Sequence, residues 1–457
     1  MQEAAQILHK LWGYPGFRPQ QLPIVEAIAG GRDVLAILPT GGGKSVTFQI
    51  PALLCSGTTL VVTPLVALME DQVSRLRAMR IAAACLHGEL SAERRSEVLK
   101  GIGDGRWSLL YLSPETLLSP AVWPRLLTTD ISRIVLDEAH CLVSWGSSFR
   151  PSYHRLGAAR LALGAPPLCA LTATATAAAA AKLERLLGLI DPVRLVQPPY
   201  RANLFLQVRW MWSNPQRLGA MRAFLATCPP DSSGLIYLRT RAGAERLARQ
   251  LASLGYRCTH YHAGLAGPTR RAIERDWLAG RQQFLLATNA FGMGVDAPHV
   301  RWVIHANTPP SLEEYLQEIG RAGRDGEPAT ALLLASEPSG LIEPSDHNLH
   351  RHFHEQQQRH WQQARQALAQ LPARGAFRAD LALSLALLHE CGQLVWETPF
   401  VYRITQSAAI FSQPAPTHLL RSYLLTRHCR WQFLLSAFGQ AHSAPCGHCD
   451  RCCRTLR

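Results

Sequence analysis

The sequence predicts an α/β fold with two consecutive doubly wound parallel-sheet domains, followed by a smaller helical region and a cysteine-rich terminus. Short apolar runs alternate with stretches of helical periodicity, which is the pattern of βαβ units. The runs are too continuously apolar for half-exposed strands, so they fit strands that are covered on both faces. The alternation occurs twice along the chain, and this repetition predicts two domains.

The strands of the first block are expected between residues 27 and 189. They are DVLAIL at 33–38, TTLVVT at 58–63, SLLYLS at 108–113, RIVLDEAH at 133–140 and LCALTATAT at 168–176. Helices are expected between them, for example at 69–78 and 177–187. We expect the first domain to span residues 1–195.

The second block repeats this pattern. Its expected strands are SGLIYL at 233–238, RCTHYH at 257–262, QFLLAT at 283–288, WVIHAN at 302–307 and ATALLLAS at 329–336. The stretch between the blocks, residues 191–204, is rich in Pro and Arg and is expected to be a linker. We expect the second domain to span residues 196–340.

The chain changes character after the second block. Residues 346–370 are rich in His and Gln, and residues 379–405 have the pattern of a helix, a turn and two strands. Leu381, Leu385 and Leu388 share one helical face, which should be buried. We expect residues 341–417 to form either a small winged-helix-like module or a helical bracket packed against the second domain, and the sequence leaves both open.

The charge of the chain favours a polyanionic partner. The 457 residues contain 47 Lys and Arg against 33 Asp and Glu, a net charge of 47 − 33 = +14, which suits nucleic acid or an anionic membrane surface. The longest strongly apolar stretch, at 381–388, is far shorter than the roughly 20 residues of a membrane-spanning helix. With no export signal at its N-terminus, the chain is expected in a reducing, cytoplasmic compartment.

A glycine-rich loop, PTGGGKS at 39–45, follows the first expected strand and precedes a helix. Its backbone N–H groups can wrap a phosphate, and the helix N-terminus adds a favourable dipole. Lys44 can reach the β- and γ-phosphates, and Ser45 can ligate Mg²⁺. Because Leu38 stands where the usual pattern has its first glycine, a turn with an incidental lysine is the alternative. The candidate nucleotide ligands are Thr40, Gly41, Gly42, Gly43, Lys44 and Ser45.

Two carboxylates close a later apolar strand. Asp137 and Glu138 begin the sequence DEAH at 137–140, and the carboxyl end of such a strand lies beside the phosphate loop in an open parallel sheet. Asp137 can hold Mg²⁺, directly or through water, and Glu138 can orient and deprotonate the attacking water. With the phosphate loop, this pair predicts hydrolysis of a nucleoside triphosphate.

These motifs and QEIGRAGRDG at 317–326 resemble those of superfamily 2 helicases, and the chain is more similar still to the RecQ family of DNA helicases. The segments that carry the resemblance occur in family order over residues 8–340: GYPGFRPQQ, PTGGGKS, TPLVALMEDQV, DEAHCLVSWGSSFRP, ALTATAT, YHAGL, ATNAFGMGVDAPHVR and QEIGRAGRDG. The resemblance implies two tandem RecA-like domains that use ATP and Mg²⁺ to translocate 3′→5′ and unwind DNA. It implies a role in repair or recombination, on single-stranded and forked or branched DNA.

The resemblance also assigns roles within the nucleotide site. Tyr14, Arg18 and Gln21 match the family's adenine-recognition segment, in which Tyr14 stacks and Gln21 hydrogen-bonds the base. Asp296 matches a position near the ribose. Single-strand binding protein is a candidate partner, and a bacterial chain of this kind would be associated with the nucleoid.

Residues of the second block match the family's phosphate-side contacts. Arg324 matches the arginine finger, and Gln317 and Arg321 match its neighbours. Thr172 and Thr174, in the first block, match the motif that links hydrolysis to domain movement.

An aromatic-rich segment, residues 141–155, directly follows DEAH. Trp145, Phe149 and Arg150 are the candidate DNA contacts, because aromatic rings interleaved with Arg can stack on unpaired bases at roughly 1–3 kcal/mol per base. In RecQ proteins this loop senses single-stranded DNA and signals to the ATP site. Ser147 stands where the family usually has His. The alternative is that the aromatic residues belong to the core.

Three cysteines near the C-terminus have the spacing of a zinc site, CxxCxxC at Cys446, Cys449 and Cys452. A fourth ligand is required, and His428, His442, His448 and Cys453 are candidates by position. The RecQ zinc module has its remaining ligand 17 residues upstream of the first of these cysteines, and this resemblance selects Cys429. We expect residues 418–457 to form a zinc-binding module, as in a short RecQ form that ends after it.

Overall fold

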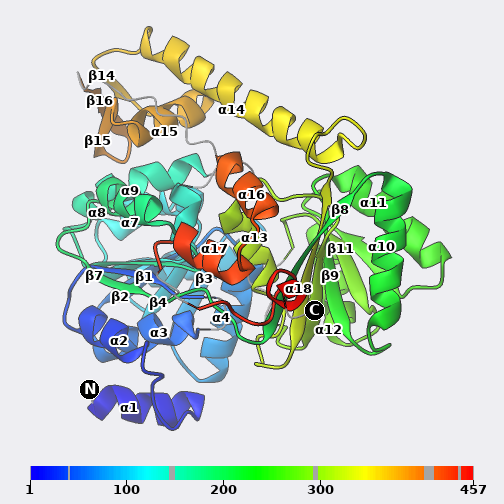
Figure 1. The fold of residues 1–457 in the computed structure, drawn as a ribbon. Coiled ribbons are helices and arrows are strands. Elements are labelled where there is room, and N and C mark those ends of the chain that lie inside the picture. Colours follow the sequence, from blue (N-terminus) through cyan, green and yellow to red (C-terminus); the bar gives the residue numbers. More distant parts are fainter. Residues whose placement is uncertain are drawn as a thin grey trace. The chain divides into compact units, whose positions relative to one another are not determined.

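The computed structural model describes residues 2–39, 42–143, 150–291, 297–405, 416–440 and 444–455 (Figure 1). Several residues singled out above lie outside the described residues: Thr40, Gly41, Trp145, Ser147, Phe149, Asp296 and His442. Among the described residues, no helix is both long and apolar enough to cross a membrane.

The first domain is built on a parallel sheet whose described strands follow the order β3-β4-β2-β5-β6-β1-β7. The strands are β1 (Val34–Ile37), β2 (Thr58–Val62), β3 (Ala83–Leu86), β4 (Leu109–Leu112), β5 (Ile131–Leu136), β6 (Leu168–Thr172) and β7 (Val193–Val196). Every residue of β1, β2, β4 and β6 is buried, which explains their uninterrupted apolar sequences. The helices are α1 (Gln2–Ile7), η1 (Leu8–Trp12), α2 (Leu22–Ala29), α3 (Lys44–Leu54), α4 (Val66–Ala78), α5 (Ala92–Gly103), α6 (Pro114–Leu117), α7 (Trp123–Leu126), η2 (Ala139–Leu142), η4 (Pro151–Arg155), α8 (Leu156–Ala162) and α9 (Ala177–Leu187).

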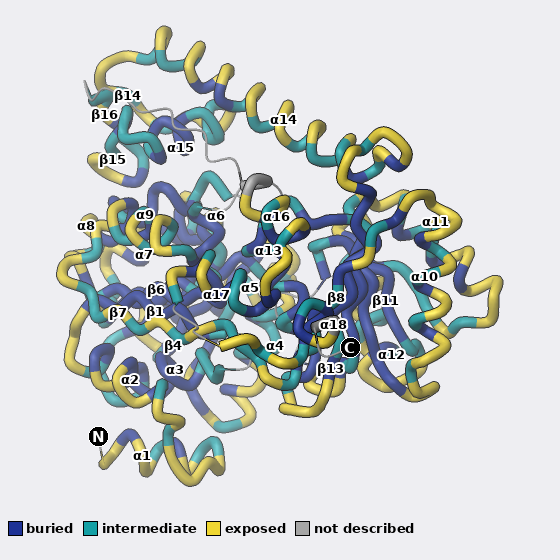
Figure 2. Tube along the Cα trace, in the orientation of Figure 1, coloured by how far each residue is buried: buried dark blue, intermediate teal, exposed yellow. Residues whose placement is uncertain are grey.

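The second domain is a separate parallel sheet in the order β10-β11-β9-β12-β13-β8. Its strands are β8 (Leu204–Met211), β9 (Ser233–Tyr237), β10 (Cys258–Tyr261), β11 (Phe284–Ala287), β12 (Val300–His305) and β13 (Ala329–Ser336). Its helices are α10 (Asn214–Thr227), α11 (Arg241–Ser253), α12 (Gly267–Leu278) and α13 (Leu312–Ile319). The two sheets confirm the predicted pair of doubly wound domains, and their strands form the most buried parts of the chain (Figure 2).

Three strands differ from the sequence expectations. β3 has the sequence AACL, too short and too small in its side chains to stand out as an apolar run. β7 lies inside the expected linker, where it pairs with β1 at the sheet edge. Its residues alternate between half-buried and exposed, and the exposed Arg194 pairs with Glu184. β8 extends the second sheet beside β13.

The region after the second domain begins with a long helix, α14 (Ser345–Leu368). A small module follows, which consists of β14 (Arg374–Ala376), η5 (Ala379–Leu381), α15 (Ala382–Glu390), β15 (Leu394–Thr398) and β16 (Val401–Ile404). Its antiparallel sheet has the order β14-β16-β15, so the module combines a helix with a hairpin and a third short strand. Leu385 and Leu388 are fully buried and Leu381 partly so, as the helical spacing predicted. We call residues 374–404 the hairpin module.

The chain divides into two compact units, and the division falls inside α14. One unit contains Met1–Gln197 and Gln357–Ser412, and the other contains Pro198–Gln356 and Gln413–Arg457. The hairpin module therefore packs with the first domain, whereas the bracket hypothesis had placed this region on the second. The contacts responsible involve side chains distant in sequence, which explains why local patterns did not reveal them.

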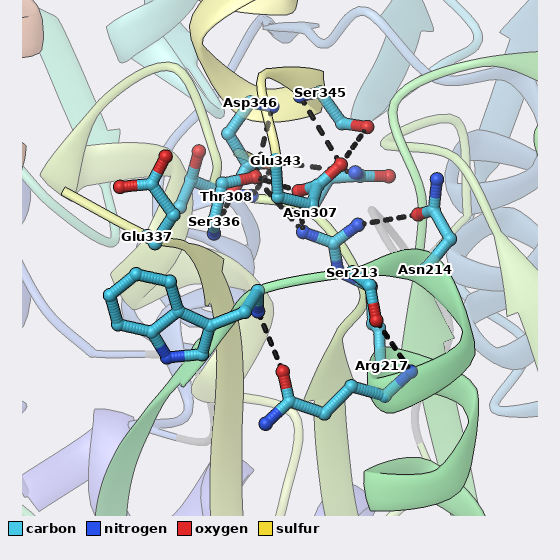
Figure 3. A network of polar contacts seen from close by, with 12 residues as sticks. Ser213, Asn214, Arg217, Asn307, Thr308, Ser336, Glu337, Glu343, Ser345 and Asp346 are labelled. Carbon is cyan, nitrogen blue, oxygen red and sulfur yellow. Dashed lines mark hydrogen bonds and ion pairs between the residues drawn. The ribbon is translucent and has the colours of Figure 1, made fainter. Parts of the chain in front are cut away.

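Polar side chains anchor the start of α14 to the second domain (Figure 3). The Asp346 carboxylate accepts hydrogen bonds from the backbone N–H groups of Ser336 at 2.9 Å and Thr308 at 3.2 Å. The Glu343 carboxylate accepts one from Arg217 Nη2 at 2.7 Å, and these two side chains are buried. A buried carboxylate with this many donors fixes one geometry, so the helix leaves the end of β13 in a defined way.

The cysteine-rich region covers the β8 edge of the second sheet. It contains α16 (Pro416–Leu425), α17 (Arg430–Ala437) and α18 (Cys452–Thr455). Trp431 Nε1 donates to Leu204 O at 3.2 Å, and the backbone N–H of Asp450 donates to Leu206 O at 2.9 Å. These contacts use backbone groups that an edge strand would otherwise leave unpaired.

Candidate nucleotide site and metal centre

The phosphate-loop residues that the structure describes lie between β1 and α3. Gly43 has φ +72°, in the left-handed region, and a Cβ there would approach Gln21 Nε2 to 2.3 Å. The positive φ favours glycine at this position, and any larger residue would also displace the Gln21 amide. Gln21 Nε2 donates to Gly43 O at 3.1 Å, and Gln21 Oε1 accepts from Arg18 N at 2.9 Å. The amide expected to read adenine thus braces the phosphate loop in this structure.

Lys44 is the first residue of α3 and has the environment of an anion ligand. Its Nζ is buried and has no hydrogen-bond partner among the residues that the structure describes. The nearest opposite charge is Glu138 Oε1, at 3.7 Å. A buried ammonium without a hydrogen-bond acceptor is costly, and a phosphate beside the start of α3 would satisfy it.

Asp137 and Glu138 lie at the carboxyl end of β5. Burial raises the pKa of Asp137 to about 6, and the adjacent negative charge of Glu138 adds to this effect. A divalent cation would reverse this effect, because it favours the ionised carboxylate. Glu138 adopts φ +52°, a strained conformation for a residue with a side chain. Ser45, in the first turn of α3, supplies the hydroxyl that fits the same cation.

A polar chain connects Glu138 to β6. His140 Nδ1 lies 3.3 Å from Glu138 Oε2 and 3.3 Å from Thr172 Oγ1. Thr172 Oγ1 also donates to Thr174 O at 3.1 Å. The carboxylate at the end of β5 is therefore joined through one buried imidazole to the residues expected to link hydrolysis with movement.

The remaining candidates of the first domain lie nearer the surface. Tyr14 is 53% exposed, which leaves its ring free to stack on a base. Arg18 is exposed beside it. Arg150 Nη2 donates to Pro64 O at 3.0 Å, and its Nη1 lies 3.7 Å from Glu115 Oε2. Arg150 is thus held at the surface by two contacts.

The candidates of the second domain belong to α13 and the turn after it. Gln317 lies on the helix, and Arg321 and Arg324 follow it. Arg321 is buried, and Arg324 Nε donates to Gly320 O at 3.5 Å. Arg239 holds the helix in place, because its buried guanidinium pairs with Glu314 and Glu318 on α13.

The four predicted zinc ligands lie together. The Sγ atoms of Cys429, Cys446, Cys449 and Cys452 all lie within 4.8 Å of one another. Cys446 Sγ is 3.9 Å and Cys449 Sγ 3.5 Å from Cys452 Sγ, the spacing of thiolates around one tetrahedral ion. Cys453 is exposed, and its Sγ donates to Gly447 O. Cys429 thus occupies the fourth position.

The surroundings of the cysteine cluster fit a cation. Backbone N–H groups of Arg430 and Cys446 point to the sulfurs of Cys449 and Cys429, at 3.4 and 3.3 Å. Burial raises the pKa of Cys452 to about 11, and the neighbouring thiols add to this effect. Four thiolates would repel each other here without a metal, and Zn²⁺ would supply the compensating charge.

A second group, which the sequence did not suggest, consists of Glu245, His260 and His262 in the second domain, with ligand atoms within 4.8 Å. His262 Nε2 lies 3.0 Å from Glu245 Oε1. Burial and the neighbouring His262 lower the pKa of His260, whereas the charge of Glu245 raises it. This group is better explained as a hydrogen-bonded pair with a stacked imidazole.

Comparison with known protein families gives three matches along the chain. The model of the DEAD/DEAH box helicase domain matches residues 18–183, that of the helicase conserved C-terminal domain matches residues 218–326, and that of the RecQ zinc-binding domain matches residues 416–453. The third match contains all four clustered cysteines.

Individual relatives match over longer stretches. The chain is 44% identical over 470 residues to the ATP-dependent DNA helicase RecQ of Synechocystis sp., with 99% of this chain and 98% of the relative covered. It is 40% identical over 336 residues to the probable ATP-dependent DNA helicase RecS of Bacillus subtilis, with 73% and 67% covered. The solved structure of the Mycobacterium smegmatis helicase Lhr has a TM-score of 0.58 at 23% identity, over 72% of this chain and 47% of that one, which shows a shared fold.

Proposed function

This chain belongs to the RecQ family of ATP-dependent DNA helicases, and we propose that it couples ATP hydrolysis to 3′→5′ movement on single-stranded DNA. It is an ATP-hydrolysing DNA helicase of the RecQ type. The observation that carries the proposed site is the buried Lys44 Nζ, which has no hydrogen-bond acceptor in the described part of the chain. This atom lies beside Glu138, at the start of a helix.

Each side chain of the first domain has a separate role in this proposal. Lys44 and the N–H groups of the phosphate loop bind the β- and γ-phosphates, and Tyr14 stacks on adenine. Ser45 and Asp137 hold Mg²⁺, which when bound neutralises the phosphate oxygens. Glu138 accepts the proton of the attacking water.

The second domain completes the proposed reaction. Gln317, Arg321 and Arg324 contact the phosphates, and Arg324 stabilises the charge that develops on the γ-phosphate. An arginine supplied by one domain to ATP bound on another makes the domain arrangement sensitive to the γ-phosphate. We propose that Trp145, Phe149 and Arg150 contact single-stranded DNA, and that forked or branched DNA is the substrate. Single-strand binding protein is a proposed partner.

Substitution of Lys44 tests the site. Lys44→Ala should lower ATP turnover at least about 100-fold, because the charge on the phosphates is no longer stabilised, and should leave single-strand binding near wild type. Lys100→Ala, an exposed lysine on α5, is the matched control. Unwinding by Lys44→Ala at the wild-type rate would overturn the assignment.

Substrate and direction are tested with one set of duplexes. Unwinding of 3′-tailed, 5′-tailed, forked and Holliday-junction DNA is compared with that of an RNA duplex. A preference for 3′-tailed and forked DNA is expected. Stronger stimulation by RNA would favour an RNA helicase, and ATPase without unwinding would favour a DNA-dependent ATPase that binds or remodels DNA without processive unwinding.

A further inference from the structure

The tip of the β15–β16 hairpin is inserted into the first domain. Phe400, in the turn, packs against the hydrophobic core of that domain, and its ring meets Trp123 of α7 edge-on at 5.7 Å. β15 contacts α8, and α15 contacts η4. A wing that separates strands presents its tip to the duplex, whereas this tip is occupied by protein contacts.

Arg155, the last residue of η4, is held by the hairpin module. Its guanidinium lies 3.7 Å from the ring centroid of Phe377, and its Nη1 donates to Pro399 O at 3.4 Å. The side chain is only 6% exposed. A planar cation stacked on an aromatic ring gives a directional contact that is stronger when desolvated, so the module fixes the orientation of η4.

Charged groups add a second attachment. The Glu390 side chain, at the end of α15, is almost fully buried and forms an ion pair with Lys182 on α9. Arg185 Nη2 donates to Glu390 O at 2.7 Å. Loss of the lysine would remove this ion pair from the almost fully buried Glu390 carboxylate, which destabilises the contact.

The short helix η4, which the hairpin module contacts, adjoins the proposed DNA contacts. η2 begins directly after Glu138, and η4 begins directly after Arg150. Residues of both short helices, Leu142 and Tyr153 among them, belong to one buried cluster that Phe400 packs against. The segment between η2 and η4 therefore has its two ends set in a core to which the hairpin module contributes.

We propose that the hairpin module is an intrachain positioning element for DNA-stimulated ATP hydrolysis, and that Arg155 and Glu390 are its positioning residues. The inference rests on the proposed role of Arg150 and its neighbours in DNA binding. Docking of the module fixes the position of η4. Because η4 directly follows Arg150, it fixes in turn the C-terminal end of the proposed DNA-contacting segment, whose other end follows the DEAH carboxylates. A module that separates strands would instead leave stimulation of the ATPase independent of docking.

A charge exchange tests this proposal. Lys182→Glu and Glu390→Lys each place like charges together, and the double variant restores an ion pair. Each single variant should lower single-strand-stimulated kcat about tenfold, as expected for a coupling of one to two kcal/mol, with basal ATPase and the KM for ATP unchanged. The double variant should recover most of the stimulation. Glu355→Lys, at an exposed position of α14, is the control for charge reversal.

Two further measurements make the result decisive. Hydrogen exchange of η4 and α15 reports undocking in each variant, and Arg155→Lys keeps the charge but loses the planar stack on Phe377. Full stimulation in a variant whose η4 exchanges rapidly would overturn the proposal, as would equal loss of basal and stimulated ATPase. Absence of stimulation in the wild-type protein would instead overturn the proposed DNA-dependent function on which the inference rests.

Discussion

Replacement of Arg239 tests how α13 is held. Its guanidinium is 4% exposed and donates to Glu314 Oε1 at 2.5 Å and Glu318 Oε2 at 2.6 Å. His305 Nε2 lies 2.7 Å from the same Glu318 oxygen. Arg239→Met retains a long side chain but removes the cation, and it leaves the buried Glu318 carboxylate with the hydrogen bond to His305.

The expected cost follows from the proton balance. Although burial alone would raise it, Arg239 and His305 hold the pKa of Glu318 below its ordinary value of 4.5. Loss of one partner of a buried pair costs about 3–5 kcal/mol. Protonation of Glu318 at pH 7 would relieve this, but it costs about 2.5 × 1.36, or roughly 3.4 kcal/mol. Protonation of His305 is a second route, so we expect a loss of about 3 kcal/mol at pH 7.

Both relief routes bind a proton in the folded variant that the unfolded chain does not bind at pH 7. The stability loss should therefore shrink as the pH falls from 7 to 5, by up to about 1.4 kcal/mol per pH unit. Hydrogen exchange of the α13 amides measures the local free energy of opening. Arg75→Met, at an exposed pair with Asp71, is the control and should change stability by under about 1 kcal/mol. A loss that did not vary with pH would refute the reasoning.

Two other outcomes follow from the described contacts. Cys446→Ser or Cys449→Ser should release the single zinc ion expected per chain and expose the β8 edge to proteolysis. Cys453→Ser is the control and should retain the metal. Full zinc content in Cys449→Ser, measured by elemental analysis, would contradict the proposed ligand set. Burial and the charge of Arg185 lower the pKa of His389 from 6.5 to about 4. As the pH falls, the unfolded chain therefore protonates His389 at a higher pH than the folded chain does. Docking of the hairpin module should weaken by up to about 3 kcal/mol from His389 alone as pH falls from 6.5 to 4. His389→Gln should reduce that slope in hydrogen exchange of α15 without abolishing it, because the neighbouring buried His154 also has a lowered pKa.

The two parallel sheets could be predicted because their strands are nearly continuous apolar runs. β3 and β7 escaped prediction for different physical reasons: β3 is short and has small side chains, and β7 is an edge strand whose residues alternate between half-buried and exposed. The cysteine cluster was also predictable, because three ligands lie within seven residues and tetrahedral geometry demands a fourth.

The position of the hairpin module could not be predicted. Its attachment depends on Arg155 reaching Phe377 and on Lys182 reaching Glu390, pairs that are more than 200 residues apart. Neither pair has a local periodicity, and each residue alone suits an exposed helix or loop. The contact of Gln21 with Gly43 could not be predicted either. The Gln21 amide can hydrogen-bond either the phosphate loop or an adenine base, and the sequence alone does not distinguish between these two partners.

The contacts at the two ends of α14 explain why this helix is rich in His and Gln. Asp346, at its start, is bound to the second domain, and Trp361, near its end, belongs to the core of the region that packs with the first. Most of the residues between them are exposed or half-buried, and Leu349 and Phe353 are the large apolar residues there, so His and Gln occupy many of the other positions. A helix with so few apolar residues along its middle turns is stabilised mainly by packing at its two ends. The His- and Gln-rich stretch therefore marks a connection between two packed bodies, which neither helical periodicity nor charge would have distinguished from a solvated surface helix.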